Sequence, residues 1–312
     1  MNEPKNARDF ALHESGSTPM PPFETVCIVG VGLIGGSFGL AVKAAGLAKR
    51  VVGVARRAET IEKAVARGAI DEGGADAATV AAGADFVFLA PPVAQMRSLC
   101  EQIAPVLRAG AIVTDAGSTK AEIVRECAPF FAGKASFVGG HPMAGSEQTG
   151  VEAARADLFQ GAMWLLTPTA RTPDFAVANL KKLVENLGAT PLLLDPDTHD
   201  KLLAVTSHVP HITASALMHV FLQSRSEHEI VQKLVGSGWR DGTRVAAGSP
   251  EMWRDICLAN SASVGRSVAD MVVELNRFQA LLEKEDAQGL FDWFDSAATA
   301  RRKQGYVPRS TR

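Results

Sequence analysis

The stretch Thr25-Val26-Cys27-Ile28-Val29-Gly30-Val31-Gly32-Leu33-Ile34-Gly35 decides the fold of this 312-residue chain. Its apolar first half predicts a buried strand, and the glycines that follow at once have the spacing G-x-G-x-x-G. Residues 37–45 then have the pattern of a helix. In such a strand–turn–helix unit, the first glycine permits a tight turn and the second lets a pyrophosphate approach the backbone. The third lets the helix pack on the strand, and the helix N-terminus faces the phosphates.

This pattern predicts a dinucleotide-binding site formed by Gly30, Gly32, Leu33, Ile34 and Gly35. The spacing alone is a weak signal, and the alternative is a glycine-rich turn in another kind of α/β protein. The position of the glycines between a strand pattern and a helix pattern favours the dinucleotide site.

The end of the second predicted strand, residues 50–54, bears on the choice of cofactor. NAD sites usually place an acidic residue here, which accepts a hydrogen bond from the ribose 2′-hydroxyl. This chain has Arg56 and Arg57 instead, and its first acidic residue is Glu59. Because guanidinium groups suit a 2′-phosphate, we expect NADP, or use of both NAD and NADP. The alternative is that both arginines are solvated charges at a helix entry and that NAD binds.

The first two hundred residues alternate between strand and helix patterns. Further strands are expected at 85–90, 111–115, 136–140, 163–167 and 190–194, and helices at 59–69, 93–107, 121–130 and 173–187. This alternation predicts an α/β fold with a Rossmann-type, doubly wound parallel sheet. Strand ends border the cofactor crevice in such folds, so Pro91 and Asp115 join the expected cofactor-binding residues.

The remainder of the chain has helical patterns, which predict a second, all-helical domain. Long helices are expected over 250–284 and 286–303, and Pro210 should kink or divide an earlier helix. The expected organisation is a flexible leader (1–22), a dinucleotide-binding domain (23–195) and a helical substrate and dimerisation domain (196–312).

Bulk composition places the chain among ordinary folded proteins, with 46% hydrophobic and 21% charged residues. A net charge of −2 gives no electrostatic reason to expect a nucleic-acid or membrane partner. The four cysteines lack CxxC pairs, so we expect neither a metal site nor a disulfide framework. No apolar run approaches the roughly 18 residues of a membrane helix, and we expect a cytoplasmic protein.

Three further patches are more specific. Residues 115–120 read D-A-G-S-T-K and residues 140–147 read G-H-P-M-A-G-S-E. The helical part contains S-H-V-P-H at 207–211, G-W-R-D-G-T-R-V-A at 238–246 and M-W-R-D-I at 252–256. In kind, order and spacing these patches resemble the prephenate/arogenate dehydrogenase family of tyrosine biosynthesis, and the resemblance covers roughly residues 24–290.

The resemblance implies an NAD(P)-dependent oxidative decarboxylation of prephenate to 4-hydroxyphenylpyruvate, of arogenate to tyrosine, or of both. It also implies a homodimer formed through the helical domain. In this chemistry one group must accept the proton of the ring hydroxyl, cations must hold the carboxylates, and a nicotinamide face must lie against the ring carbon.

His141 is the expected proton acceptor, because an unperturbed imidazole pKa of about 6.5 suits this task. The resemblance gives the same role to the histidine of the G-H-P motif, and it places Ser118 beside that histidine to orient or polarise it. The alternatives are a structural histidine that bonds a loop backbone, and a serine that caps a helix starting at Thr119.

The resemblance implies that Arg244 clamps a substrate carboxylate, for which a guanidinium offers two parallel donors. His211 is expected to line the substrate pocket, with helix packing as the alternative. Further expected substrate-binding residues are Ser146, Glu147, Arg240 and Trp253, where Trp253 serves the partner subunit's site. For Arg240, as for Arg254, an exposed or interface ion pair is the alternative.

Two other functions are possible for a chain with this pattern. One is another hydroxyacid dehydrogenase with a Rossmann and a helical domain, although most such enzymes use a lysine or a Lys-Asn pair on a helix of the second domain, whereas the proton acceptor expected here is His141. The other is a non-catalytic NAD(P)-binding regulator, which the set His141, Ser118 and Arg244 argues against. The sequence does not choose between prephenate and arogenate, because they differ only in a keto or amino group on the side chain.

Overall fold

The computed structural model describes residues 21–146 and 148–304. The predicted flexible leader lies outside the described residues except for its last two, so it stays a prediction. The chain divides into two compact units. The first, called the sheet unit below, runs up to Asp200 and takes in Gly248–Ala259. The second, the helical unit, comprises Lys201–Ala247 and the residues from Asn260 onward.

This division by contacts does not coincide with the expected domain boundary at 195/196, which stays a prediction. The change of unit falls inside helix α7 (Pro196–Leu203), and helix α10 (Pro250–Ala259) returns to the sheet unit. The physical reason is packing, because α10 contacts the 3-10 turn Val93–Gln95 and buries Ile256.

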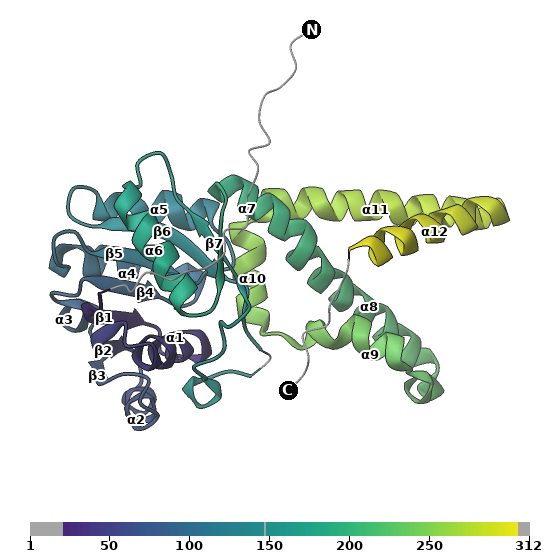
Figure 1. Ribbon diagram of the computed structural model, residues 1–312. Coiled ribbons are helices and arrows are strands. Elements are labelled where there is room, and N and C mark those ends of the chain that lie inside the picture. The colour runs from purple at the N-terminus through teal and green to yellow at the C-terminus, as the bar shows by residue number, and fades with distance from the viewer. Residues whose placement is uncertain (1–20, 147, 305–312) are drawn as a thin grey trace, which may run out of the picture. The chain divides into compact units, whose positions relative to one another are not determined.

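Within the described residues of the sheet unit, eight strands form one sheet in the order β3-β2-β1-β4-β5-β6-β7-β8 (Figure 1). The strands are β1 (Phe23–Val29), β2 (Ala48–Val54), β3 (Glu72–Gly74), β4 (Phe86–Leu89), β5 (Ile112–Asp115), β6 (Ser136–Pro142), β7 (Met163–Thr167) and β8 (Thr190–Leu193). Strands β1 to β6 run parallel. The predicted Rossmann-type sheet is therefore confirmed.

Helices cover both faces of this sheet. They are α1 (Leu33–Ala44), α2 (Ala58–Ala66), α3 (Ala77–Ala81), α4 (Met96–Ile103), α5 (Ala121–Phe131) and α6 (Asp174–Asn186), with 3-10 turns at Val93–Gln95, Ala104–Val106 and Val151–Ala153. Side chains from α1, α2 and α6 share one hydrophobic core, and those from α3, α4 and α5 share the other. Alternate residues of β1 enter the two cores: Ile28 enters the first, and Cys27, buried as expected, enters the second.

The last two strands depart from the expected all-parallel sheet. Strand β7 pairs antiparallel with β6, with Gly140 opposite Leu166, and β8 is parallel to β7. A parallel pair needs a crossover connection, usually an α-helix. The described residues between β6 and β7 contain only a 3-10 turn, so the chain reverses direction there. The short elements β3 and α3 were not predicted from the sequence.

The helical unit continues from α7 without a break in helical structure. Its elements are a π-helical turn (Ala204–His208), α8 (Val209–Glu227), a 3-10 turn (Glu229–Leu234), α9 (Ser237–Thr243), a 3-10 turn (Arg244–Ala247), α11 (Ser261–Glu283) and α12 (Ala287–Lys303). The chain accommodates Pro210, at the second position of α8, directly after the wider π-helical turn. The single helix expected over 250–284 is two helices, which separate at the buried Asn260.

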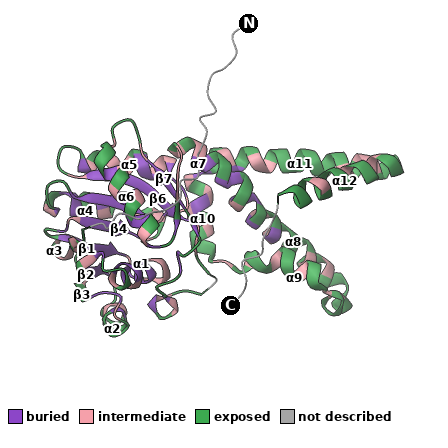
Figure 2. Ribbon diagram, viewed as in Figure 1, coloured by how far each residue is buried: buried purple, intermediate pink, exposed green. Residues whose placement is uncertain are grey.

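Apolar burial is sparse in the helical unit. Among the described residues, Val264 is the one buried residue of α11, and α12 has none. Figure 2 shows exposed residues along most of both helices. Large apolar side chains stay accessible, including Val273 at 62%, Leu275 at 55% and Phe291 at 63%. Among the described helices, none combines the length and the apolar character that a membrane crossing requires.

Candidate active site

The glycine-rich turn between β1 and α1 has the geometry of a dinucleotide site. A Cβ atom on Gly30, whose φ is +97°, would lie 2.7 Å from the carbonyl carbon of Ala90. A Cβ on Gly35 would collide with the carbonyl oxygen of Gly30, so the third glycine lets α1 pack on the turn. A Cβ on Gly32 would meet nothing within 4 Å among the described residues. The backbone at Gly32 is therefore open at the N-terminus of α1, and the residues fit a pyrophosphate.

The two arginines after β2 are exposed, and no acid of the described residues forms an ion pair with either one. Glu59, the first acid after the strand, instead pairs with Lys63 at 2.6 Å. The hydrogen bond and charge of Lys63, with a smaller contribution from Arg57, hold the pKa of Glu59 below its usual value. Glu59 is therefore engaged within α2, and Arg56 and Arg57 remain the charged groups beside the end of β2.

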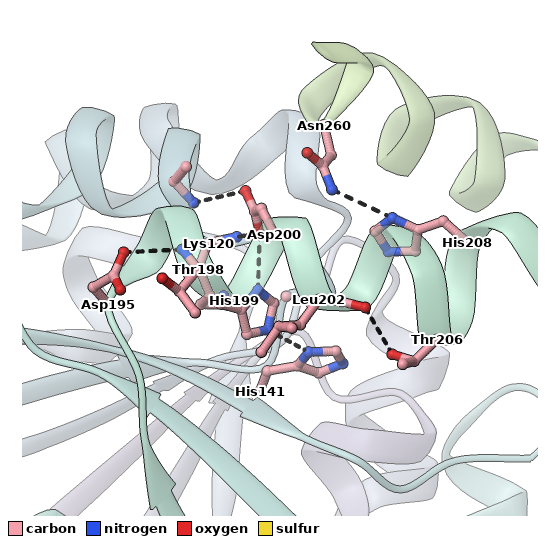
Figure 3. Close-up of polar contacts among 12 residues, drawn as sticks. Lys120, His141, Asp195, Thr198, His199, Asp200, Leu202, Thr206, His208 and Asn260 are labelled. Atoms are coloured by element: carbon pink, nitrogen blue, oxygen red, sulfur yellow. Dashed lines mark hydrogen bonds and ion pairs between the residues drawn. The ribbon is translucent and has the colours of Figure 1, made fainter. Parts of the chain in front are cut away.

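His141 lies near the end of β6, where the strand is buried along its whole length. Its side chain is 8% exposed. The ring nitrogen Nδ1 of His141 lies 2.9 Å from Nε2 of His199, which belongs to α7 (Figure 3). The structure therefore joins the predicted proton acceptor to a second histidine, 58 residues further along the chain.

His199 in turn contacts its neighbour Asp200, with 2.8 Å between Nδ1 and Oδ1. The carboxylate of Asp200 also accepts hydrogen bonds from the backbone N–H groups of Lys120 at 2.7 Å and Ala121 at 2.9 Å. These N–H groups belong to the N-cap residue and to the first residue of α5, so Asp200 caps a helix that lies 79 residues away in sequence. Sequence reasoning missed both residues. The only available signal was a His-Asp pair in the first turn of a helix that follows a strand.

The loop between β5 and α5 is organised by a buried ion pair. Asp115 and Lys120 are both inaccessible to solvent, and the ammonium group contacts the carboxylate. The same carboxylate accepts hydrogen bonds from the backbone of Gly117 at 2.8 Å and of Gly140 at 2.9 Å. Asp115 therefore ties this loop to β6 directly beside His141. Its predicted contact with a cofactor stays a prediction.

Ser118 is half-buried in this loop. The helix expected to start at Thr119 starts at Ala121, and Asp200 supplies the capping oxygens, so the alternative role of Ser118 as a cap is wrong. The predicted role of Ser118 in orienting His141 stays a prediction, and the structure places His199 at the Nδ1 atom of that ring.

The expected substrate-binding residues are distributed over both units. Ser146 is exposed in the sheet unit, where its hydroxyl accepts a hydrogen bond from the backbone of Gln148 at 3.2 Å, and Glu147 lies outside the described residues. Trp253 is half-buried on α10. Arg254 pairs with its neighbour Asp255 at 2.7 Å, which agrees with the ion-pair alternative.

In the helical unit, His211 is buried on α8, and burial lowers the pKa of its ring. Arg240 on α9 donates to the carbonyl of Val235 at 3.5 Å and is exposed. Arg244 is exposed at the start of a 3-10 turn. The side-chain amide of Asn260 lies 3.4 Å from Nδ1 of His208, which links α11 to the start of α8. The substrate contacts of His211, Arg240 and Arg244 stay predictions.

Comparisons with known proteins identify the family. Residues 38–193 match the nucleotide-binding domain of prephenate dehydrogenase, and residues 195–296 match its dimerization domain. Prephenate dehydrogenase of Bacillus subtilis is 35% identical over 291 residues, which are 91% of this chain and 78% of the relative. Cyclohexadienyl dehydrogenase of Zymomonas mobilis is 32% identical over 90% of this chain and 96% of the relative.

Solved structures agree with these matches. Prephenate dehydrogenase from A. aeolicus, in complex with hydroxyphenyl propionate and NAD+, superposes with a TM-score of 0.84 at 33% identity, covering 92% of this chain and 99% of that one. Synechocystis arogenate dehydrogenase gives a TM-score of 0.78 at 31% identity, covering 90% and 99%. This chain belongs to the prephenate dehydrogenase family and is an NAD(P)-dependent dehydrogenase of that family.

Proposed function

We propose that this chain oxidises and decarboxylates prephenate to 4-hydroxyphenylpyruvate, with arogenate as the second substrate to be tested. The observation that carries the proposal is the burial of His141 near the end of β6. The residue before it, Gly140, donates a hydrogen bond to Asp115 at the end of β5. The B. subtilis and Lactococcus lactis relatives are both named prephenate dehydrogenase, at 35% identity. The alternative substrate is favoured by the likeness to Synechocystis arogenate dehydrogenase.

The reaction assigns a task to each group. His141 accepts the proton of the ring hydroxyl through Nε2, while the hydrogen on the same ring carbon leaves as hydride. A bound oxidised nicotinamide supplies the hydride acceptor. The ring carboxylate then leaves as CO₂, its bonding electrons make the ring aromatic, and the proton held on His141 returns to the phenolic oxygen. Aromatisation makes the overall step favourable, so the protein chiefly has to bind, orient and move one proton.

Cations must hold the carboxylates of the substrate, and we assign this task to Arg244. Arg244 is exposed directly after α9, and no ion pair among the described residues involves its guanidinium. His211 lines the substrate pocket in this proposal. Ser118 orients His141, and Ser146 and Glu147 complete the polar end of the pocket together with Arg240 and the partner subunit's Trp253.

The helical unit forms a homodimer in this proposal. The match to the family's dimerization domain covers residues 195–296. The exposed apolar side chains of α11 and α12 support it, since an isolated unit of this kind leaves Val273, Leu275 and Phe291 in water. A second copy that covers these side chains removes the unfavourable free energy of exposing them to water.

For the cofactor, we propose NADP or dual use. Arg56 and Arg57 support this choice, because they stand where NAD sites place an acid and because Glu59 is engaged by Lys63. The test compares kcat/KM for NAD and NADP in the wild type and in Arg56→Ala/Arg57→Ala. Loss of the phosphate contacts should lower the NADP/NAD ratio by about 10-fold. An unchanged ratio contradicts the proposal, and Arg125→Ala, an exposed arginine on α5, is the control.

The experiment that tests the function is a two-by-two assay of prephenate or arogenate with NAD or NADP. Reduction of the nicotinamide is followed by absorbance, and the aromatic product is identified by chromatography. Turnover with prephenate supports the proposal, and turnover with arogenate alone replaces it by the second candidate. Cofactor binding without turnover of either substrate overturns it.

A further inference from the structure

A buried chain of hydrogen bonds connects the proposed proton acceptor to the N-terminus of a helix. It runs from His141 to His199, then to Asp200, and then to the backbone N–H groups of Lys120 and Ala121 at the N-terminus of α5 (Figure 3). Each link between heavy atoms measures 2.7–2.9 Å. His199 is inaccessible to solvent and Asp200 is 3% exposed. All residues that form these hydrogen bonds belong to the sheet unit, so the distances between them are set within that unit.

The carboxylate of Asp200, at the end of this series of hydrogen bonds, determines which atom donates and which accepts in each of them. Asp200 accepts from two backbone N–H groups at the start of α5, an 11-residue helix whose N-terminus favours negative charge. Burial opposes ionisation, but the hydrogen bonds from His199, Ala121 and Lys120 together hold the pKa of Asp200 below its usual value. An ionised carboxylate can only accept hydrogen bonds. The Nδ1 atom of His199 must therefore carry a hydrogen and donate it to Asp200.

The state of His199 follows from its surroundings. Burial lowers the pKa of this ring in spite of the adjacent Asp200, and the nearby charge of Lys120 acts in the same direction. A neutral imidazole carries one hydrogen, and on His199 that hydrogen is on Nδ1. Its Nε2 atom is then an acceptor, 2.9 Å from Nδ1 of His141. For a hydrogen bond to form there, Nδ1 of His141 must be the donor.

We propose that His199 and Asp200 are positioning residues that hold neutral His141 in the tautomer with its hydrogen on Nδ1. The lone pair of His141 then lies on Nε2, which is the atom that accepts the substrate proton. When that proton arrives, the Nδ1–H bond to His199 keeps the charged ring in the same orientation. This inference rests on the proposed function only for the identity of the proton donor; the tautomer belongs to the free protein.

The first test is NMR spectroscopy of the full-length protein labelled with ¹⁵N-histidine, without substrate or cofactor. Imidazole nitrogens resonate differently with and without a hydrogen, and comparison with His141→Asn assigns the His141 signals. We expect the hydrogen of neutral His141 on Nδ1, and the same tautomer at His199. A hydrogen on Nε2 of His141 in the wild type overturns the proposal. This result is independent of which substrate, if any, the enzyme turns over.

The second test is a graded kinetic series. His199→Gln keeps an acceptor oxygen near the position of Nε2, His199→Leu removes it, and Asp200→Asn removes the charge that orients His199. We expect kcat to fall about 10- to 100-fold in His199→Leu and less in His199→Gln, with KM changed by less than about threefold. The matched control is Asp195→Asn, which alters an exposed carboxylate that caps the same helix through Thr198.

The outcomes separate positioning from a purely structural role. The proposal holds if kcat decreases from the wild type to His199→Gln and further to His199→Leu, while the His141 tautomer shifts toward Nε2–H in His199→Leu and Asp200→Asn. It is overturned if His199→Gln and His199→Leu lose kcat equally, if KM alone rises, or if the folded variants keep full kcat. Melting temperatures of each variant establish that folded protein is compared. If no substrate is turned over, the proposed function fails while the tautomer measurement still stands.

Discussion

The two units of this protein differ in where their apolar and polar groups lie. In the sheet unit, two hydrophobic cores flank the sheet, and even the Asp115–Lys120 ion pair is withdrawn from water. In the helical unit, α12 buries none of its described residues, and α11 buries only Val264. Since apolar burial is the main stabilising force in folding, these two cores stabilise the sheet unit from both faces of the sheet. In the helical unit, by contrast, large apolar side chains such as Val273, Leu275 and Phe291 remain accessible.

The largest expected effect comes from replacing His141 in the sheet unit. His141→Asn should lower kcat by about 10²- to 10⁴-fold, because a positioned base contributes on that scale. Steady-state kinetics with the substrate identified by the two-by-two assay measures the loss. His219→Asn, an exposed histidine on α8, is the control. Retained kcat in folded His141→Asn would remove this histidine from the mechanism.

The next effect tests the proposed homodimer of the helical unit. Leu275→Asp combined with Phe291→Asp places two charges on its exposed apolar surface, and the dimer should weaken by at least about 100-fold. Light scattering and sedimentation over a concentration series measure the change. Val65→Asp makes a similar change at an exposed valine of α2, in the sheet unit, and should leave association as in the wild type. A wild-type dimer in the double variant places the interface elsewhere.

A third experiment asks whether the helical unit contributes to substrate binding. Arg244→Gln should raise KM for the substrate by about 10- to 100-fold, because it removes a charge-assisted pair of hydrogen bonds. The effect on kcat should be smaller, since a carboxylate clamp acts in the ground and transition states alike. Arg225→Gln, on the exposed last turn of α8, is the control. If KM does not change, another cation holds the carboxylate.

The smallest effect concerns the pH dependence of stability in the sheet unit. The folded-state pKa of Asp200 is depressed, so its contribution to stability is present above the unfolded pKa of about 3.9 and is lost as the pH falls below it. Melting temperature should therefore fall less steeply between about pH 5 and pH 3 in Asp200→Asn than in the wild type. Parallel curves for the two proteins would show that this carboxylate is not ionised and capped as described.

Sequence patterns predicted the strands and helices of the sheet unit well where the signal was local. The glycine turn illustrates this, because Gly30, Gly32 and Gly35 act within one strand–turn–helix unit and each position has its own steric reason. The split of the predicted 250–284 helix at Asn260 was missed, because a single polar residue in an apolar-striped helix carries little local signal. Its burial beside His208 appears only when the helices pack.

In the candidate site, too, local motifs were predicted from the sequence, whereas contacts between distant residues were not. His141 could be identified from its motif, but the motif did not show which residue contacts its Nδ1 atom. That residue is His199, 58 positions further along the chain, and the residue that caps α5 is Asp200, 79 positions after Ala121. No periodicity or spacing connects such residues, because their contact depends on how β6, α5 and α7 are placed by the sheet.

The sequence by itself determined the dinucleotide turn, the family and the succession of strands and helices, since these depend on short-range sterics and on motifs of adjacent residues. Tertiary structure alone decided the reversal at β7, the return of α10 to the sheet unit and the His141–His199–Asp200 chain. The physical reason is the same for all three. Each is a contact between segments far apart in the chain, and its free energy depends on packing and on the burial of polar groups that only the complete fold creates.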